Sequence, residues 1–366
     1  MVSVPENIKA IHSYEPGQTV EELQQQYKWD KYAVLWNNEN TLGASKLALQ
    51  SIKKELENSN FYPDPKARIL CEKIATKWEV KSDNIVLGNG SEGLLMNIIR
   101  AFCRDGDELL TSEGSFVIIY NWARVNNVMC RSVPLRDDYS FDLNGILKSI
   151  HRQTKIIYLS NVNNPTGAMI SCSELEDFLN KVPKEILVIV DEAYFEFSKH
   201  LNPAFPDSSK LKMDNVITIR TFSKAYGIAG NRLGFAIASE KIINTLYKVR
   251  LTFEPSNLSQ AAGLGALDDN EFLSHTLKNN SRGLHHYYSE FESLGIKYVQ
   301  SHGNFVMIVL PSPEQAQRVT QELLVKGVLV RHLGGTLSHC IRISVGQPEE
   351  NQLCTAMLRE ITTAIS

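Results

Sequence analysis

A short segment around Lys224 combines side chains that could hold an aldehyde cofactor carrying a phosphate. Residues 221–235 contain one lysine, the hydroxyls of Thr221 and Ser223, Arg232 and three glycines, between apolar runs at 216–219 and 235–238. A lysine amine forms a Schiff base with an aldehyde, while hydroxyls and a guanidinium bind phosphate. A glycine-rich surface turn with a solvated lysine would have the same composition. The segment alone leaves both interpretations open.

A carboxylate at the end of a buried strand favours the first interpretation. Residues 186–190 are continuously apolar, which predicts a strand buried on both faces, and Asp191-Glu192-Ala193-Tyr194 follows. A buried carboxylate is costly unless it meets a cation or a donor. The protonated ring nitrogen of pyridoxal phosphate is such a cation, and an Asp there makes the ring an electron sink. Tyr194 could reach the ring's phenolic oxygen, although Asp191 could instead cap the next helix.

A third polar segment follows another predicted strand. Residues 156–161 read as a strand, and Asn164-Pro165-Thr166-Gly167 comes directly after it. Alone, this tetrapeptide indicates only a turn, because Pro presets its own φ and Gly permits positive φ. Its place before the Asp191 and Lys224 segments makes Asn164 a candidate donor to the phenolic oxygen of the cofactor. Asp191 and Lys224 are 33 residues apart, which is enough for one crossover between neighbouring strands.

Together the three segments resemble the motifs of type I fold aminotransferases, which use pyridoxal phosphate. Further matches narrow the resemblance to the histidinol-phosphate aminotransferases and run from about Tyr14 to the C-terminal region. They lie at residues 13–17, 38–40, 61–65, 88–91, 330–331 and 341–346. The resemblance implies catalytic roles for Lys224, Asp191 and Tyr194.

The start of a helix near Gly90 is the expected phosphate site. A short strand at 85–87 is followed by Gly88-Asn89-Gly90-Ser91 and by an apolar helical face at 94, 95, 98, 99 and 102. We predict Ser91 as the N-cap, and free amides at a helix start suit an anion. The family pattern has Ser-Asp-Glu where this chain has Ser91-Glu92-Gly93. Backbone amides are retained through such a change.

The resemblance assigns the remaining site residues. Phe116 would stack on the cofactor ring, and Tyr62 would approach the cofactor phosphate from a neighbouring subunit. Arg342, surrounded by isoleucines, would bind the substrate carboxylate, with an internal acidic partner as the competing explanation. The expected cofactor-binding set is Tyr62, Gly90, Ser91, Glu92, Phe116, Asn164, Asp191, Tyr194, Thr221, Ser223, Lys224 and Arg232. The expected substrate-binding set is Tyr14, Asn40, Arg331 and Arg342.

The implied reaction moves an amino group from histidinol phosphate, or a related amino acid, to 2-oxoglutarate. Freed Lys224 would act as the general base. Thr41 and the segment 332–340 differ from the family near the expected substrate end. An aminotransferase for aromatic or specialised amino acids therefore remains an alternative, as does a decarboxylase related to the threonine-phosphate enzymes of the same fold.

These side chains need an α/β scaffold to position them. Strand-like and helix-like runs alternate over residues 41–256, which predicts a large cofactor-binding domain with a parallel sheet. By resemblance, that sheet is mostly parallel, seven-stranded and sandwiched by helices. Residues 257–366 predict a small C-terminal α+β domain, and residues 1–40 an N-terminal arm and part of the small domain.

Composition limits the possible partners. The net charge is −3 and no basic run occurs, so nucleic acid is not an expected partner. The six cysteines form no C-x-x-C pair and the nine histidines no H-E-x-x-H motif, so we expect reduced thiols, no metal and a cytoplasmic protein. No apolar stretch reaches the ~18 residues of a membrane span. The resemblance implies a homodimer whose active sites are shared between subunits.

Overall fold

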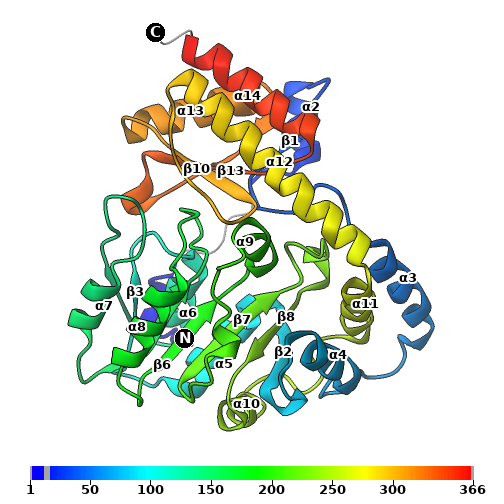
Figure 1. Cartoon of the computed structure of the whole chain (residues 1–366), viewed down its shortest axis with the longest axis vertical. Helices are drawn as coiled ribbons and strands as arrows, with labels where there is room; N and C mark the ends of the chain where they lie inside the picture. The colour runs from blue at the N-terminus through cyan, green and yellow to red at the C-terminus, as the bar shows by residue number, and fades with distance from the viewer. Residues whose placement is uncertain (1, 12–16, 364–366) are drawn as a thin grey trace.

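The computed structural model describes residues 2–11 and 17–363 and contains one large and one small main sheet (Figure 1). The large sheet has seven strands in the order β2-β8-β7-β6-β5-β3-β4. Only β8 runs antiparallel to its neighbours, so the prediction of a mostly parallel seven-stranded sheet is confirmed. The strands are β2 (Ile85–Asn89), β3 (Glu108–Ser112), β4 (Met129–Val133), β5 (Thr154–Ser160), β6 (Leu187–Asp191), β7 (Val216–Thr221) and β8 (Leu233–Ile237).

Helices cover both faces of this sheet. One face packs against α5 (Gly90–Phe102), α6 (Val117–Val125) and α10 (Glu240–Leu246), and the other against α7 (Leu143–Ser149) and α8 (Cys172–Lys181). The β2–β8 end packs against α3 (Lys46–Glu55), α4 (Arg68–Trp78) and α11 (Asn257–Asp268). Alternation along each strand divides the side chains between these clusters: Ile156 and Tyr158 face α5, whereas Ile157 and Leu159 face α8.

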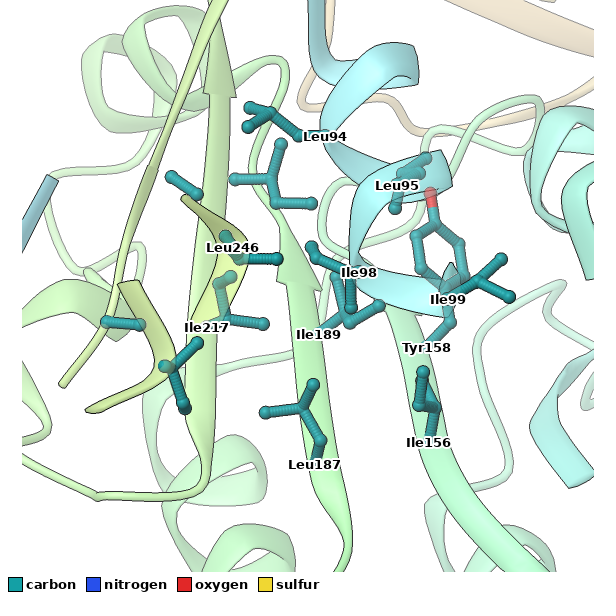
Figure 2. Close-up of a cluster of buried hydrophobic side chains, with 14 of the residues drawn as sticks. Leu94, Leu95, Ile98, Ile99, Ile156, Tyr158, Leu187, Ile189, Ile217 and Leu246 are labelled. Atoms are coloured by element: carbon teal, nitrogen blue, oxygen red, sulfur yellow. The ribbon is translucent and has the colours of Figure 1, made fainter. Parts of the chain in front are cut away.

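The α5 helix is held on the sheet by one apolar stripe. Leu94, Leu95, Ile98 and Ile99 recur at helical spacing and point down onto the strands (Figure 2). Each is at most 1% exposed, and burying a side chain of this size contributes about 1.5–3 kcal/mol. This packing fixes the N-terminus of α5 above the carboxyl end of β2.

The small sheet lies beyond a long connecting helix, α12 (Asn270–Leu294) (Figure 1). Its strand order is β12-β13-β10-β9, and α13 (Pro313–Val325) and α14 (Pro348–Thr363) pack on it. The strands are β9 (Lys297–Val299), β10 (Phe305–Val309), β12 (Arg331–His332) and β13 (Cys340–Ser344). Near the N-terminus, β1 (Ala33–Val34) pairs with β11 (Val328–Leu329). The buried side chains of α11 pack in the same cluster as those of β2 and β8. The domain boundaries at residues 40 and 256 remain predictions.

The remaining elements are short. They are α1 (Glu6–Lys9), α2 (Val20–Tyr27), α9 (Phe195–Leu201), η1 (Leu56–Asn58), η2 (Ser82–Asn84), η3 (Ser208–Lys210), η4 (Ala229–Asn231) and η5 (Gly335–Leu337). No helix in the described ranges is long and apolar enough to cross a membrane.

Strand register brings the three predicted polar segments to one edge. Ser160 lies opposite Asp191 and Asp191 opposite Ile219, so β5 and β6 end at the same level and β7 continues two residues further, to Thr221. Thr221 lies opposite Gly234, and because β8 is antiparallel, its first residues meet the last residues of β7 and β2. Ligands of open α/β sheets bind at this carboxyl edge.

Candidate active site

Asp191 is a buried carboxylate whose hydrogen-bond donors are both neutral. It ends β6 and is 3% exposed. Its Oδ2 accepts a hydrogen bond from the Tyr158 hydroxyl at 2.9 Å, and its Oδ1 accepts one from the Ala193 amide at 3.2 Å. Burial raises the pKa of Asp191 to about 6 against the effect of these two bonds. No cation in the described part of the chain forms an ion pair with it.

Tyr194 lies just beyond Asp191 and is also buried. Its hydroxyl oxygen accepts a hydrogen bond from Asn38 Nδ2 at 3.0 Å, and its ring meets Phe305 edge-on at 5.1 Å between centroids. Burial raises the pKa of Tyr194, while nearby Arg342 acts in the opposite direction. The phenol therefore keeps its proton and can donate it in a hydrogen bond.

Asn164 and Arg342 meet across the two sheets. Arg342 Nη1 donates to Asn164 Oδ1 at 2.7 Å, and Nη2 donates to the carbonyl of Trp36. Arg342 is 8% exposed, its Nε lacks a hydrogen-bond partner among the described residues, and burial lowers its pKa to about 10. The internal acidic partner considered from the sequence is absent from the described contacts. A buried guanidinium without a carboxylate is suited to an anionic ligand.

Lys224 lies in the segment after β7, close enough to Arg342 to feel its charge. Its Nζ donates to the Asn37 carbonyl at 2.9 Å. Burial, followed by the positive charge of Arg342, lowers the pKa of Lys224 to about 8. An amine with this pKa is partly neutral near pH 7, which both nucleophilic attack and proton abstraction require.

The start of α5 and Arg232 form a small cradle. A Cβ on Gly90, which has φ of +70°, would lie 2.5 Å from Arg232 Nη2. A Cβ on Gly234 would lie 2.6 Å from the Ser91 amide nitrogen, so only glycine lets β8 approach the helix start. Arg232 itself has φ of +48°, a conformation that non-glycine residues adopt at a cost and that clusters at binding sites.

Two hydroxyls complete the cradle. Thr221 Oγ1 donates to Ser223 Oγ at 2.9 Å and accepts from the Ser223 amide at 3.1 Å. Arg232 Nη1 approaches Ser223 Oγ at 3.5 Å and donates to the Ala229 carbonyl at 3.1 Å. The guanidinium, the hydroxyls and the helix amides thus converge at the carboxyl edge of the sheet.

The predicted N-cap at Ser91 is wrong. Asn89 occupies that position without a side-chain capping bond, and the helix already begins at Gly90. The positive φ of Gly90 turns the chain directly from β2 into α5, which leaves Ser91 inside the first turn. Glu92 is half-buried in the same turn, where its negative charge interacts favourably with the helix dipole.

The other expected residues lie in different settings. Phe116 is the half-buried N-cap of α6 and packs against the α5 cluster. Tyr62 is 80% exposed and stacks on Phe253 at 4.3 Å. Asn40 Nδ2 donates to Thr276 Oγ1 at 3.0 Å and to the Ala225 carbonyl at 3.3 Å. Tyr14 lies outside the described residues.

Arg331 lies beside Arg342 on the small sheet. The two residues are directly opposite in the antiparallel pair β12–β13. Arg331 is exposed, and its Nη2 donates to Asn37 Oδ1 at 2.8 Å. The carbonyl of the same Asn37 accepts from Lys224. Like charges directly opposite on paired strands repel, so an anion bound between them would offset the repulsion.

Two residues that hydrogen-bond to the predicted site residues were not predicted from the sequence, Tyr158 and Asn38. Tyr158 lies within an apolar strand pattern. The alternation of side chains along β5 and β6, which places Tyr158 and Asp191 on the same face of the sheet, is the feature that could have indicated the contact. Asn38 lies in the segment 38–40, where the resemblance assigns a role to Asn40. The bond from Asn38 to Tyr194 joins residues 156 positions apart and depends on the tertiary fold.

The residues present fit pyridoxal phosphate. Asp191 is a buried carboxylate that lacks a cation, which the protonated ring nitrogen would supply. The Gly90–Arg232 cradle offers the donors that a phosphate requires. Lys224 directly follows Ser223, one of the cradle residues, and its amine donates to the Asn37 carbonyl.

Comparison with known proteins identifies the family. The profile described as Aminotransferase class I and II matches residues 30–357. The chain belongs to the class I and II aminotransferases. The prediction of a pyridoxal phosphate-dependent transaminase is thereby confirmed, together with its cofactor.

Several curated relatives of this aminotransferase cover nearly its whole length. Histidinol-phosphate aminotransferase 2 of Pasteurella multocida is 38% identical over 361 residues, covering 98% of each chain. Histidinol-phosphate aminotransferase of Bacillus subtilis is 35% identical over 362 residues, covering 98% of this chain and 99% of that one. The predicted resemblance to the histidinol-phosphate aminotransferases is confirmed by these relatives at 35–38% identity.

Solved structures share the fold of the aminotransferase. Histidinol-phosphate aminotransferase from Sinorhizobium meliloti, in complex with pyridoxal-5'-phosphate, superposes with a TM-score of 0.91 at 27% identity over 100% of this chain and 99% of that one. L-threonine-O-3-phosphate decarboxylase from Porphyromonas gingivalis superposes with a TM-score of 0.78 at 20% identity over 90% and 99%. The second likeness concerns the fold alone.

Proposed function

We propose that the aminotransferase takes its amino group from histidinol phosphate and passes it to 2-oxoglutarate. The observation that carries this proposal is the pair Arg331–Arg342, two guanidinium groups that are directly opposite on neighbouring strands and lack an acidic partner in the described contacts. Histidinol phosphate carries a phosphate ester where an amino acid carries its carboxylate. The same guanidinium groups can therefore receive the phosphate of the donor and the α-carboxylate of the acceptor in turn. The names of the full-length relatives support this choice of donor.

Lys224 is assigned as the reacting amine and general base. Pyridoxal phosphate, when bound, supplies an aldehyde that captures amines and a ring that accepts the electrons left by a departing α-proton. Lys224 Nζ would take up that proton and release it again later in the reaction. Its pKa of about 8 suits an amine that must alternate between the two protonation states near neutral pH.

Three side chains of the large sheet are assigned to the cofactor ring. Asp191 would hold the ring nitrogen in its protonated form, and Tyr194 and Asn164 would bind the phenolic oxygen. Arg342 reaches Asn164 Oδ1, so the residue that binds the substrate anion also orients the amide that meets the ring. Phe116, the N-cap of α6, would be a fourth contact that stacks on the ring face.

The phosphate of the cofactor is assigned to the cradle at α5. Ser91 and Glu92 would contribute backbone amides, and Thr221, Ser223 and Arg232 side-chain donors, whereas the Gly90 amide donates to the Arg232 carbonyl at 2.9 Å. Gly90 leaves the space in which Arg232 lies.

The active protein is proposed to be a homodimer. Tyr62 and Phe253 stack while remaining 80% and 46% exposed, and Phe61, Ile69 and Leu251 are 67–70% exposed. An exposed apolar group of this kind is typical of a protein interface. A second copy would cover it, with Tyr62 reaching the phosphate cradle of the partner. Light scattering at assay concentration tests this, since a fully active monomer would contradict it.

We assign the enzyme to the cytoplasm. All six cysteines are free thiols, which suits a reducing compartment. Fractionation of the source cells, with an assay of each fraction, tests the assignment.

The decisive experiment compares donors with 2-oxoglutarate as acceptor. Histidinol phosphate, phenylalanine, aspartate and threonine phosphate are each assayed for glutamate and for carbon dioxide. We expect glutamate formation to be fastest with histidinol phosphate. A higher kcat/KM with phenylalanine would reject the donor, and carbon dioxide release without glutamate would reject the reaction. Borohydride reduction and peptide mapping should label Lys224, and a label on another lysine would reject its assignment.

A further inference from the structure

Tyr158 lies at the boundary between the apolar core and the candidate site. The side chain is 0% exposed, and its ring packs in the cluster beneath α5 beside Ile99 (Figure 2). The hydroxyl points away from Ile156 and donates to Asp191 Oδ2 at 2.9 Å. Since Tyr158 and Asp191 occupy neighbouring strands and face the same side of the sheet, the register of β5 and β6 creates this contact.

The surroundings of Asp191 leave Tyr158 as its one side-chain donor within the described residues. The Ala193 amide is the other donor. The titratable groups that affect the carboxylate are Tyr158 from β5, Glu192 at the next position of the chain and Tyr194 from the following turn. The α5 side chains packed over this face are apolar. Burial and the charge of Glu192 favour the neutral acid, and the two hydrogen bonds favour the carboxylate.

We propose that Tyr158 is a positioning residue of this enzyme, whose hydroxyl keeps Asp191 ionised and directed at the cofactor's ring nitrogen before the cofactor binds. This inference rests on the function proposed above for Asp191. Tyr158 does not touch substrate or cofactor in this scheme and acts only through the carboxylate.

The chemistry of the phenol suits this task. Burial holds the pKa of Tyr158 well above 10, so the hydroxyl retains its proton and always donates. The apolar ring fills space in the core that a phenylalanine would fill equally well. A core role alone would therefore require only the ring, whereas the proposed role requires the hydroxyl.

The test measures binding of pyridoxamine 5'-phosphate to the apoenzyme between pH 5 and pH 9. This probe carries the ring nitrogen and the phosphate but forms no Schiff base with Lys224. Wild-type affinity should fall on the acid side as Asp191 gains a proton, with a midpoint near its pKa of about 6. Titration of the probe's own phosphate is common to all variants and cancels in their comparison.

Tyr158→Phe should move the acid-side loss upward by about 1–2 pH units, the value expected when a carboxylate loses one hydrogen bond. Affinity should then be lower by on the order of tenfold at pH 6 and within about twofold of wild type at pH 9. A variant profile that coincides with wild type at every pH would overturn the proposal. A uniform loss at every pH would also overturn it, because that result indicates packing rather than control of a charge.

Two further variants distinguish the possible causes. Tyr287→Phe removes the hydroxyl of an equally buried tyrosine that donates to the Ser344 carbonyl at 3.3 Å, and its binding profile should match wild type. In the Asp191→Asn background, Tyr158→Phe should leave probe binding unchanged, because the group on which it acts is gone. A further pH-dependent loss there would overturn the proposal. Failure of the wild type to bind the probe would instead reject the proposed cofactor site.

Discussion

Asp191 and Glu192 are neighbouring acidic residues, both buried, with opposite surroundings. Glu192 is 0% exposed and accepts hydrogen bonds from Arg220 Nε at 3.0 Å and Nη2 at 2.6 Å, and from the Ser208 amide at 2.9 Å. Asp191 has only a phenol and one amide. Because successive side chains of a strand alternate, the two carboxyl groups lie on opposite faces of the sheet.

Glu192 belongs to a buried cluster of ion pairs centred on Arg220. Arg220 also pairs with Asp207 at 2.7 Å, and its guanidinium lies 3.5 Å from the centre of the Phe195 ring. A buried carboxylate that accepts two hydrogen bonds from a buried cation is compensated within the protein. A buried carboxylate without one costs folding free energy that a ligand can recover. Asp191, the carboxylate without a cation among the described residues, is therefore the candidate for a functional role. Burial alone does not distinguish the two residues, because both are almost fully buried.

Asp191→Asn should separate the two carboxylates most clearly. The neutral amide cannot hold the ring nitrogen protonated, so we expect kcat to fall by roughly 10³-fold or more. The free energy of unfolding of the apoenzyme should change little or increase, since an unpaired buried charge is removed. Steady-state kinetics and urea denaturation measure the two effects. Near wild-type turnover would make Asp191 a structural cap only.

Glu192→Gln should show the reverse pattern. Removing the charge of Glu192 leaves Asp207 as the one ion-pair partner of the buried Arg220 within the described residues, so the free energy of unfolding should fall by about 3–5 kcal/mol. The folded fraction should retain kcat within about tenfold of wild type. Urea denaturation followed by fluorescence gives the first value. A large loss of kcat with unchanged stability would show that the comparison is wrong.

Arg342→Lys tests the incompletely paired cation on the small sheet. Lysine retains the charge but loses the bidentate fork, so kcat/KM for the donor should fall roughly 10- to 100-fold. Cofactor affinity should stay within about threefold of wild type, because Arg232 is the residue assigned to the phosphate. Arg331→Ala provides the matched comparison. An equal loss for phenylalanine and histidinol phosphate in that variant would argue against a role in phosphate recognition.

The smallest expected effect is a pH dependence of apoenzyme stability. The folded pKa of Asp191 is raised to about 6, above its ordinary value, so the folded state binds more protons than the unfolded state between about pH 4 and 6. The contribution of Asp191 to stability should therefore fall as pH rises through this window, by about 2–3 kcal/mol in total. The difference between wild type and Asp191→Asn isolates it. A difference that is independent of pH would contradict the proposed ionisation.

The sequence predicted the parts of this site that lie next to strand ends. Asp191, Asn164 and Lys224 each follow an apolar run, and parallel strands place their carboxyl ends on one edge. The Tyr158 contact depended on the relative register of β5 and β6, and local composition does not contain that register. The N-cap was misplaced by two residues because the choice between Asn89 and Ser91 depends on the backbone of Gly90. The Asn38–Tyr194 bond needed the first 40 residues to be placed against the large sheet.

The division of the site between two sheets has an evolutionary consequence. Groups assigned to the cofactor lie on the seven-stranded sheet, whereas Arg331, Arg342 and the connection between β12 and β13 lie on the small sheet. Under the proposed assignment, substitutions in that connection would act on donor recognition and leave Lys224 and Asp191 unchanged. One ancestral scaffold could therefore diversify into enzymes with different donors by changing a surface segment of fewer than about ten residues.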